Sequence, residues 1–155
     1  MKEYVAIVEG RVQLDGDVID APIGRHAGNR EKMAIAGKYE RSARTVYEVV
    51  ERLGAFTVVR CFPHTGRTHQ IRVHFAYIGH PIVADALYGR RDAVYLSDLT
   101  GREHRPEEEP LLNRQALHAR RLTIHHPMLD RDMTFEAPLA ADITALIAAL
   151  RERAR

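Results

Sequence analysis

Apolar residues occupy positions 4–8 without a break, which predicts a buried strand. In the stretch EYVAIVEG, residues 3–10, apolar side chains occupy both odd and even positions. Successive side chains of an extended chain point to opposite faces, so both faces of this strand would be apolar. A strand of this kind lies inside a sheet. We therefore expect it to have neighbours on both edges.

Four later stretches also have the character of strands. RTVYEVVERL (44–53) and AFTVVRCF (55–62) are rich in β-branched and aromatic residues and flank Gly54, which predicts a hairpin that ends at Pro63. Residues 116–127 and 132–138 predict two more strands. The hairpin around Gly54 implies antiparallel pairing of its two strands.

Helical spacing appears twice. Between residues 68 and 78, Ile71, Phe75 and Ile78 recur at the helical period, and Thr68 is the predicted N-cap. A C-terminal helix is predicted over residues 139–155, with a buried stripe of Ile143, Leu146, Ile147 and Leu150.

These elements predict the fold class. We expect a mixed α+β fold with a mostly antiparallel sheet, a short helix in the middle of the chain and a C-terminal helix, formed as a single domain by residues 1–155. Residues 15–42 and 90–110 have no clear period. We expect irregular loops there, and long loops of this kind tend to be functional or mobile.

Charge and cysteine content narrow the class of protein. The net charge is only +2, but 20 of the 23 cationic residues are Arg, and many cations gather in residues 24–44. Arg suits phosphate and bases, although a GC-rich genome would give the same bias. The single cysteine, Cys61, excludes an intramolecular disulfide and is expected to be a buried apolar residue. Without a signal peptide or membrane span, a cytoplasmic protein is expected.

The stretch PHTGRTHQIRVHFAYIGHPIVADALYG, residues 63–89, concentrates cationic side chains among apolar ones. On the predicted helix, His69 and Arg72 share one face near the N-terminus, which favours anions. No Asp, Glu or Cys lies among His69, His74 and His80 to complete a metal site. Neither Ser42 nor Ser97 lies in a nucleophile turn. A purely structural alternative is that Arg72 pairs with a carboxylate and the histidines cap turns.

The chain resembles the RluA/RluD family of pseudouridine synthases. The resemblance rests on TGRTHQIRVHFAYIGHPIVADALYG, on KEYVAIVEG at 2–10, on TVYEVVE at 45–51 and on the strands of residues 114–138. It implies part of the pseudouridine synthase catalytic-domain fold and the isomerisation of uridine to pseudouridine in rRNA or tRNA. The base would be flipped into a pocket. The resemblance implies no cofactor and no metal.

The resemblance also implies roles for individual residues. Tyr4 would be the active-site tyrosine and Arg72 the arginine that pairs with the catalytic aspartate. The residues expected at the substrate are Arg67, His69, Gln70, Leu117 and His118. The cations of residues 24–44 would meet RNA phosphates.

One part of the family pattern is absent from these residues. The family's His-Arg-Leu-Asp motif, which carries the nucleophilic aspartate, has no match, because QLDGD at 13–17 follows Tyr4 and lacks the Arg. We expect a C-terminal portion of the catalytic domain that is inactive alone and completed by a separate chain carrying the N-terminal half. Arg72 would then lack its carboxylate partner. The first strand would lie near a raw edge of the sheet, that is, an edge whose backbone groups are unpaired.

Two alternatives remain open. A non-catalytic RNA-binding module would keep the pocket and bind RNA with a steep salt dependence. A truncated remnant would expose its sheet edge and self-associate.

Overall fold

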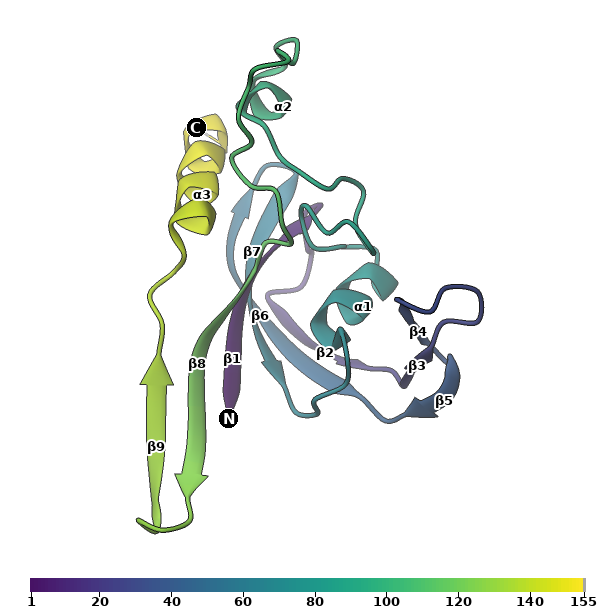
Figure 1. Cartoon of the computed structure of the whole chain (residues 1–155). Helices are drawn as coiled ribbons and strands as arrows, with labels where there is room; N and C mark the ends of the chain where they lie inside the picture. Colours follow the sequence, from purple (N-terminus) through teal and green to yellow (C-terminus); the bar gives the residue numbers. More distant parts are fainter. Residues whose placement is uncertain (155) are drawn as a thin grey trace.

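The structure, a computed structural model, describes residues 1–154 as two antiparallel sheets and three helices (Figure 1). The larger sheet has the strand order β2-β6-β7-β1-β8-β9, and the smaller one β4-β3-β5. The strands of the larger sheet are β1 (Lys2–Glu9), β2 (Gly16–Asp20), β6 (Arg44–Leu53), β7 (Phe56–Pro63), β8 (Leu117–His126) and β9 (Arg131–Glu136). Those of the smaller sheet are β3 (Ile23–Arg25), β4 (Met33–Ile35) and β5 (Lys38–Arg41), and the helices are α1 (Gln70–Tyr77), α2 (Leu96–Thr100) and α3 (Ala141–Ala154).

Strand β1 lies in the interior of the larger sheet, as its two apolar faces predict. Ala6 pairs with Val59 of β7 on one side and with Leu117 of β8 on the other. Ile7 and the following Val8 are fully buried. The expectation of a raw edge beside β1 is wrong, because β8 of the same chain covers it.

The predicted strands and the hairpin around Gly54 are confirmed. Strands β6 and β7 form the hairpin expected around Gly54, which has a left-handed φ of 63°. Glycine adopts this conformation without the strain that a Cβ would cause. Every strand pair is antiparallel, so the predicted α+β class with a mostly antiparallel sheet is confirmed.

Helix α1 covers one face of the sheet. Phe75 of α1 packs on Tyr47 of β6, with 5.4 Å between ring centroids. Tyr47 pairs with Cys61, which in turn pairs with Tyr4 of β1. Directly paired residues point to the same face, so Tyr4 also points toward α1. Cys61 is fully buried, and burial raises the pKa of its thiol, which fits the expected apolar role.

Helix α3 covers the opposite face. Glu51 pairs with Val58, three residues from Cys61, so Glu51 and Tyr47 point to opposite faces. Arg151 of α3 binds Glu51 at 2.7 Å. The predicted buried stripe of α3 is confirmed, since it consists of Ile143, Leu146, Ile147 and Leu150.

The segment 15–42, expected as an irregular loop, contains β2 and the whole smaller sheet. Strands of three or four residues are too short to show a repeated apolar alternation, and β5 is exposed throughout, so the sequence pattern missed them. Gly24 and Gly37 allow two chain segments to meet, because a Cβ on Gly24 would lie 2.5 Å from the carbonyl oxygen of Gly37. Ile23 and Val73 share a small second core that holds this sheet against α1.

The helix boundaries need two corrections. Helix α1 begins at Gln70, and its N-cap is His69 with φ 56° rather than Thr68. Helix α2 falls within residues 90–110, where no element was expected. No helix within residues 1–154 has both the length and the apolar content needed to cross a bilayer.

Candidate active site

A pocket of about 370 Å³ opens on the α1 face of the larger sheet. It lies between the N-terminal half of β1, the turn that precedes α1 and the start of β8. Cationic groups, an aromatic ring and aliphatic side chains share its walls, and no Asp or Glu of residues 1–154 belongs to them. The lining residues are Lys2, Tyr4, Pro63, Thr65, Gly66, Arg67, His69, Gln70, Ile71, Arg72, Gln115 and Leu117.

Six of the seven residues that the sequence pointed to line this pocket. They come from three separate parts of the chain, which only the folded sheet brings together. An aromatic ring, an aliphatic side chain and cationic groups in one wall suit a planar base attached to a phosphate backbone. The six are Tyr4, Arg67, His69, Gln70, Arg72 and Leu117.

The structure does not bring His118 to the pocket. Leu117 pairs with Ala6 and His118 with Val5, so the two neighbours point to opposite faces of β8. Leu117 faces α1 and the pocket, whereas His118 faces the α3 side. Its Nε2 is buried and has no hydrogen-bond partner within the described chain.

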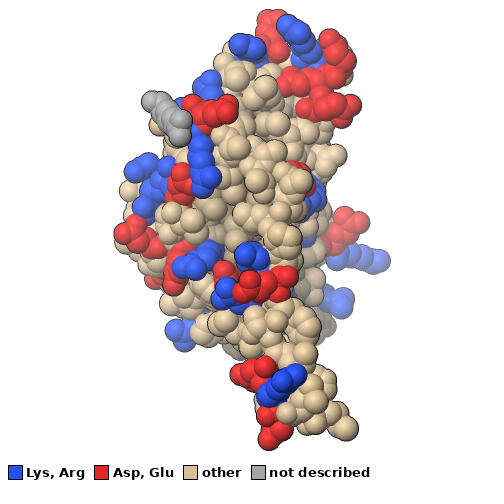
Figure 2. Space-filling model, turned by 90° about the vertical axis from the view of Figure 1, so that its left-hand side faces the viewer, with Lys and Arg blue, Asp and Glu red and all other residues tan. Residues whose placement is uncertain are grey.

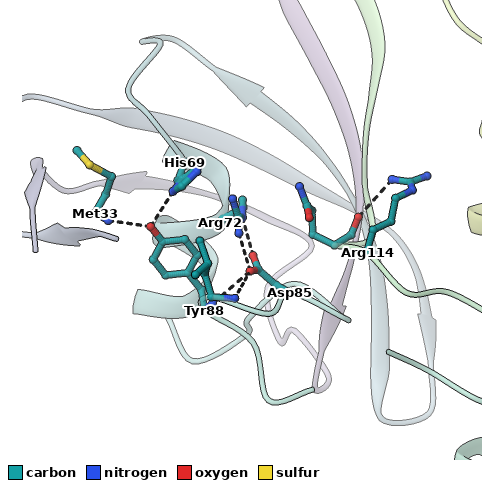
Figure 3. A network of polar contacts seen from close by, with 8 residues as sticks. Met33, His69, Arg72, Asp85, Tyr88 and Arg114 are labelled. Carbon is teal, nitrogen blue, oxygen red and sulfur yellow. Dashed lines mark hydrogen bonds and ion pairs between the residues drawn. The ribbon is translucent and has the colours of Figure 1, made fainter. Parts of the chain in front are cut away.

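Arg72 is held in a bidentate pair with Asp85 (Figure 3). Its Nε donates to Oδ2 at 2.7 Å and its Nη2 to Oδ1 at 2.8 Å. The Asp85 side chain is 0% exposed and also accepts the backbone N–H groups of Leu87 and Tyr88. The expectation that Arg72 lacks a carboxylate in this chain is therefore wrong, and the structural alternative of an internal pair is what the fold contains.

This pair keeps both groups charged. Burial alone would raise the pKa of Asp85, but the hydrogen bonds from Arg72 and from two backbone N–H groups outweigh it, so the pKa lies below its ordinary value. The hydrogen bond to Asp85 raises the pKa of Arg72. Among hydrogen bonds within residues 1–154, none uses Nη1 of Arg72. That nitrogen remains available to an acceptor in the pocket.

Tyr88 connects this pair to the smaller sheet (Figure 3). Its hydroxyl accepts the backbone N–H of Met33 at 2.8 Å and shares a hydrogen bond of 2.9 Å with Nδ1 of His69. The Arg72 guanidinium lies over its ring, 5.0 Å from the centroid. Burial, together with the charge of Arg72, lowers the pKa of His69, so its imidazole is neutral at neutral pH.

Gln70 is a structural residue of the pocket wall. Its Oε1 accepts from the Thr65 hydroxyl and from the Arg67 backbone N–H, and its Nε2 donates to the Arg44 carbonyl and the Thr45 hydroxyl. Both donors and both lone pairs of the amide are thus used inside the protein. Gln70 fixes the turn that presents Arg67 and has no hydrogen-bonding capacity left for a ligand.

The Thr45 hydroxyl extends the network to His74, which is fully buried. His74 Nε2 lies 2.9 Å from the Ala21 carbonyl oxygen, which can only accept, so Nε2 carries the proton. Its Nδ1 then accepts from Thr45 at 2.9 Å. Burial lowers the pKa of His74, in keeping with this neutral state. Helix α1 is thereby fixed to β6 and to the segment that leads into β3.

Sequence reasoning did not single out Asp85 or Tyr88. One signal was available, because a charged residue in the buried run of residues 81–85 requires a partner. Ala84, which precedes Asp85, has a φ of 55°. That left-handed conformation favours glycine, so Ala84 is strained where the chain turns toward Asp85.

Comparison with known proteins agrees with this geometry. Residues 1–77, which include both Tyr4 and Arg72, match the family described as RNA pseudouridylate synthase. Ribosomal large subunit pseudouridine synthase D of Nitrosomonas europaea is 42% identical over 151 residues, which cover 97% of this chain and 41% of that protein. The Pseudomonas aeruginosa protein of the same name is 45% identical over 151 residues, with 96% and 45% covered.

Solved structures show the same relationship. Human RNA pseudouridylate synthase domain containing 4 superimposes with a TM-score of 0.70 at 25% identity, covering 97% of this chain and 62% of that one. Human RNA pseudouridylate synthase domain containing 1 gives 0.66 at 29% identity, covering 97% and 65%. The fold is therefore that of a pseudouridylate synthase domain.

Within that class, the chain belongs to the RluA/RluD family of pseudouridine synthases. It spans about half the length of the curated relatives that it matches.

Proposed function

We propose that this chain provides the base-binding and arginine-bearing part of an RNA pseudouridine synthase. The observation that carries the proposal is the meeting of Tyr4, Arg72 and Leu117 in one pocket whose wall contains no carboxylate of residues 1–154. In this proposal a uridine of rRNA or tRNA, flipped out of its helix, lies between the Tyr4 ring and the Leu117 side chain. The setting is the cytoplasm.

The nucleophilic aspartate then comes from a segment outside these 155 residues, which can be supplied by a separate polypeptide. Arg72 would receive it through Nη1, because Nε and one N–H of Nη2 already bind Asp85. Asp85 is a positioning residue in this scheme. Its side chain is fully buried beneath Arg72 and cannot reach a base in the pocket.

The reaction is an isomerisation and conserves atoms and electrons. The bond from ribose C1′ to uracil N1 breaks, and a bond from C1′ to C5 forms. The hydrogen on C5 leaves as a proton, and N1 gains one. Tyr4 stacks on the base and is positioned to take part in this proton movement, while Arg72 holds the aspartate in its ionised form.

The test is tritium release from RNA labelled at uracil C5. We expect no release from the 155-residue chain alone and release when a polypeptide with the His-Arg-Leu-Asp motif is added. Arg72→Ala should abolish the release, whereas His118→Ala, on the opposite face, should leave it unchanged. Release by the chain alone, or full activity of Arg72→Ala in the mixture, would contradict the proposal.

Residues 1–154 contribute no carboxylate to the pocket wall. This observation also supports a second candidate function, that of a non-catalytic RNA-binding module. This candidate predicts RNA binding that weakens steeply with salt and no tritium release in any mixture. The same experiment therefore separates the two functions.

A further inference from the structure

A second groove, of about 640 Å³, continues from the pocket onto the smaller sheet. We call it the Tyr39 groove, and its principal lining residues are Arg25, Met33, Tyr39, Arg41, Gly66 and Arg67. Gly66 and Arg67 line both the groove and the pocket. Arg67 is fixed at this junction, because its Nε donates to the carbonyl oxygen of Ser42 at 3.0 Å.

Tyr39 has the features of a binding residue. It is 89% exposed and has a φ of 54°. A bulky residue in the left-handed region is strained, and so exposed a ring recovers little of that cost through burial. The strain is held in place by the close approach of Gly37 to β3, where a Cβ on Gly37 would lie 2.6 Å from the Arg25 carbonyl oxygen. The fold thus presents this aromatic ring to solvent from a fixed backbone.

The charge of the groove has one sign. Within residues 1–154, Arg25, Arg41 and Arg67 form no ion pair with a carboxylate. Glu40, which lies between Tyr39 and Arg41 in β5, is not part of the lining, and no other acid of the described chain is. By contrast, the face shown in Figure 2 has Lys and Arg interspersed with Asp and Glu.

The smaller sheet cannot move freely relative to the pocket. Tyr88 binds the Met33 backbone of β4 and the His69 ring at the start of α1. The core shared by Ile23 and Val73 adds an apolar contact between the smaller sheet and α1. A ligand seated on Tyr39 is therefore held at a defined distance from a base in the pocket.

We propose that the Tyr39 groove binds single-stranded RNA next to the uridine in the pocket. A neighbouring base stacks on the Tyr39 ring, and Arg25, Arg41 and Arg67 bind the phosphates on either side. Exposed aromatic rings bordered by cations are the usual means of holding single strands without reading their sequence. That the ligand is RNA depends on the proposed function. That a binding site exists here depends only on the geometry and charge of the Tyr39 groove.

The test uses the full chain and a short single-stranded RNA with 2-aminopurine beside a uridine. The chain has no Trp, so the probe can be excited without interference from indole. We expect the fluorescence of 2-aminopurine to be quenched on binding. Tyr39→Ala should remove the quenching and weaken binding about 5- to 150-fold, and Tyr39→Phe should restore both. Tyr77→Ala is the matched control, because Tyr77 is 61% exposed on α1 and lines neither cavity.

Salt dependence tests the role of the arginines at the phosphates. Changing Arg25 and Arg41 together to Gln should lower the slope of log K against log salt by about 0.7 for each phosphate that the protein no longer neutralises. Unchanged binding and quenching by Tyr39→Ala would overturn the proposal, even if tritium is released in the mixed assay. Tyr39-dependent binding without tritium release would support the groove and reject the catalytic function.

Discussion

Two arginine–aspartate pairs in this molecule have almost the same geometry and different surroundings. Arg72 binds Asp85 through Nε and Nη2 at 2.7 and 2.8 Å, and Arg114 binds Asp142 through the same two atoms, both at 2.8 Å. The exposed fractions of the side chains are 12% and 0% in the first pair but 40% and 36% in the second.

The comparison shows that burial, and not hydrogen-bond length, separates the two pairs energetically. Losing one partner of a buried pair leaves a charge without solvent or a counterion, whereas water replaces the partner of an exposed one. The pairs also act at different places. Asp85 fixes a guanidinium at the pocket, and Arg114 joins the start of α3 to β8 through Asp142 and the Leu117 carbonyl oxygen.

The largest expected effect comes from Asp85→Asn. This change leaves Arg72 without its carboxylate in a buried site and should lower the free energy of unfolding by about 3–5 kcal/mol. Asp142→Asn is the matched change in the exposed pair and should cost no more than about 1 kcal/mol. Urea denaturation of both variants measures the difference. Equal losses would mean that burial does not distinguish the pairs.

An intermediate effect is expected in the acid range. The pKa of Asp85 is lowered in the folded state, so its stabilisation is present above the unfolded value of about 3.9 and is lost as the pH falls through the folded value. Each proton taken up on unfolding changes the free energy by about 1.4 kcal/mol per pH unit.

Stability measured between about pH 5 and about pH 3 should therefore fall less steeply for Asp85→Asn than for the wild type. The pKa of Asp142 is also lowered, since its hydrogen bonds from Arg114 and the Ile143 N–H outweigh burial. Because Asp142 is more exposed than Asp85, its ionisation contributes less to stability than that of Asp85. Asp142→Asn should therefore keep most of the wild-type dependence of unfolding free energy on pH. If the stability of Asp85→Asn fell more steeply with acid than that of the wild type, Asp85 would not be the group whose protonation destabilises the fold.

The smallest expected effect is that of salt. Ionic strength screens exposed charges strongly and buried ones weakly. Raising NaCl from about 0.05 to about 0.5 M should remove most of the penalty of Asp142→Asn and leave that of Asp85→Asn nearly unchanged. Urea denaturation at the two salt concentrations checks this, and a salt-sensitive penalty at Asp85 would show that water reaches the pair.

Local patterns were sufficient to predict much of the fold. Strands β1, β6, β7 and β8 and helix α3 are long enough for their apolar periodicity to be read in the sequence. The smaller sheet and α2 were missed because their segments have three to five residues and no repeated face. The start of α1 was misplaced because His69, in a left-handed conformation, precedes the helix where Thr68 looked like the cap.

The pocket was predicted less from pattern than from resemblance. Strand alternation alone shows that Leu117 and His118 cannot both face one pocket. Only the register of β8 against β1 shows that Leu117 is the one that does. Asp85 was missed because its partner Arg72 lies on a helix and Asp85 in the loop that follows it. A helical or strand period relates residues within one element and does not relate a helix residue to a residue of the following loop.

The place of β1 in the sheet has a consequence for the order of folding. The pocket wall joins Tyr4 and Leu117, and β1 meets β8 through pairing between distant parts of the chain. During synthesis β1 appears before β8, so its second edge waits until β8 has been made. Pairing of such long range slows folding and leaves an unpaired edge in the meantime. The pocket wall of the nascent chain is therefore complete only after β8 has left the ribosome.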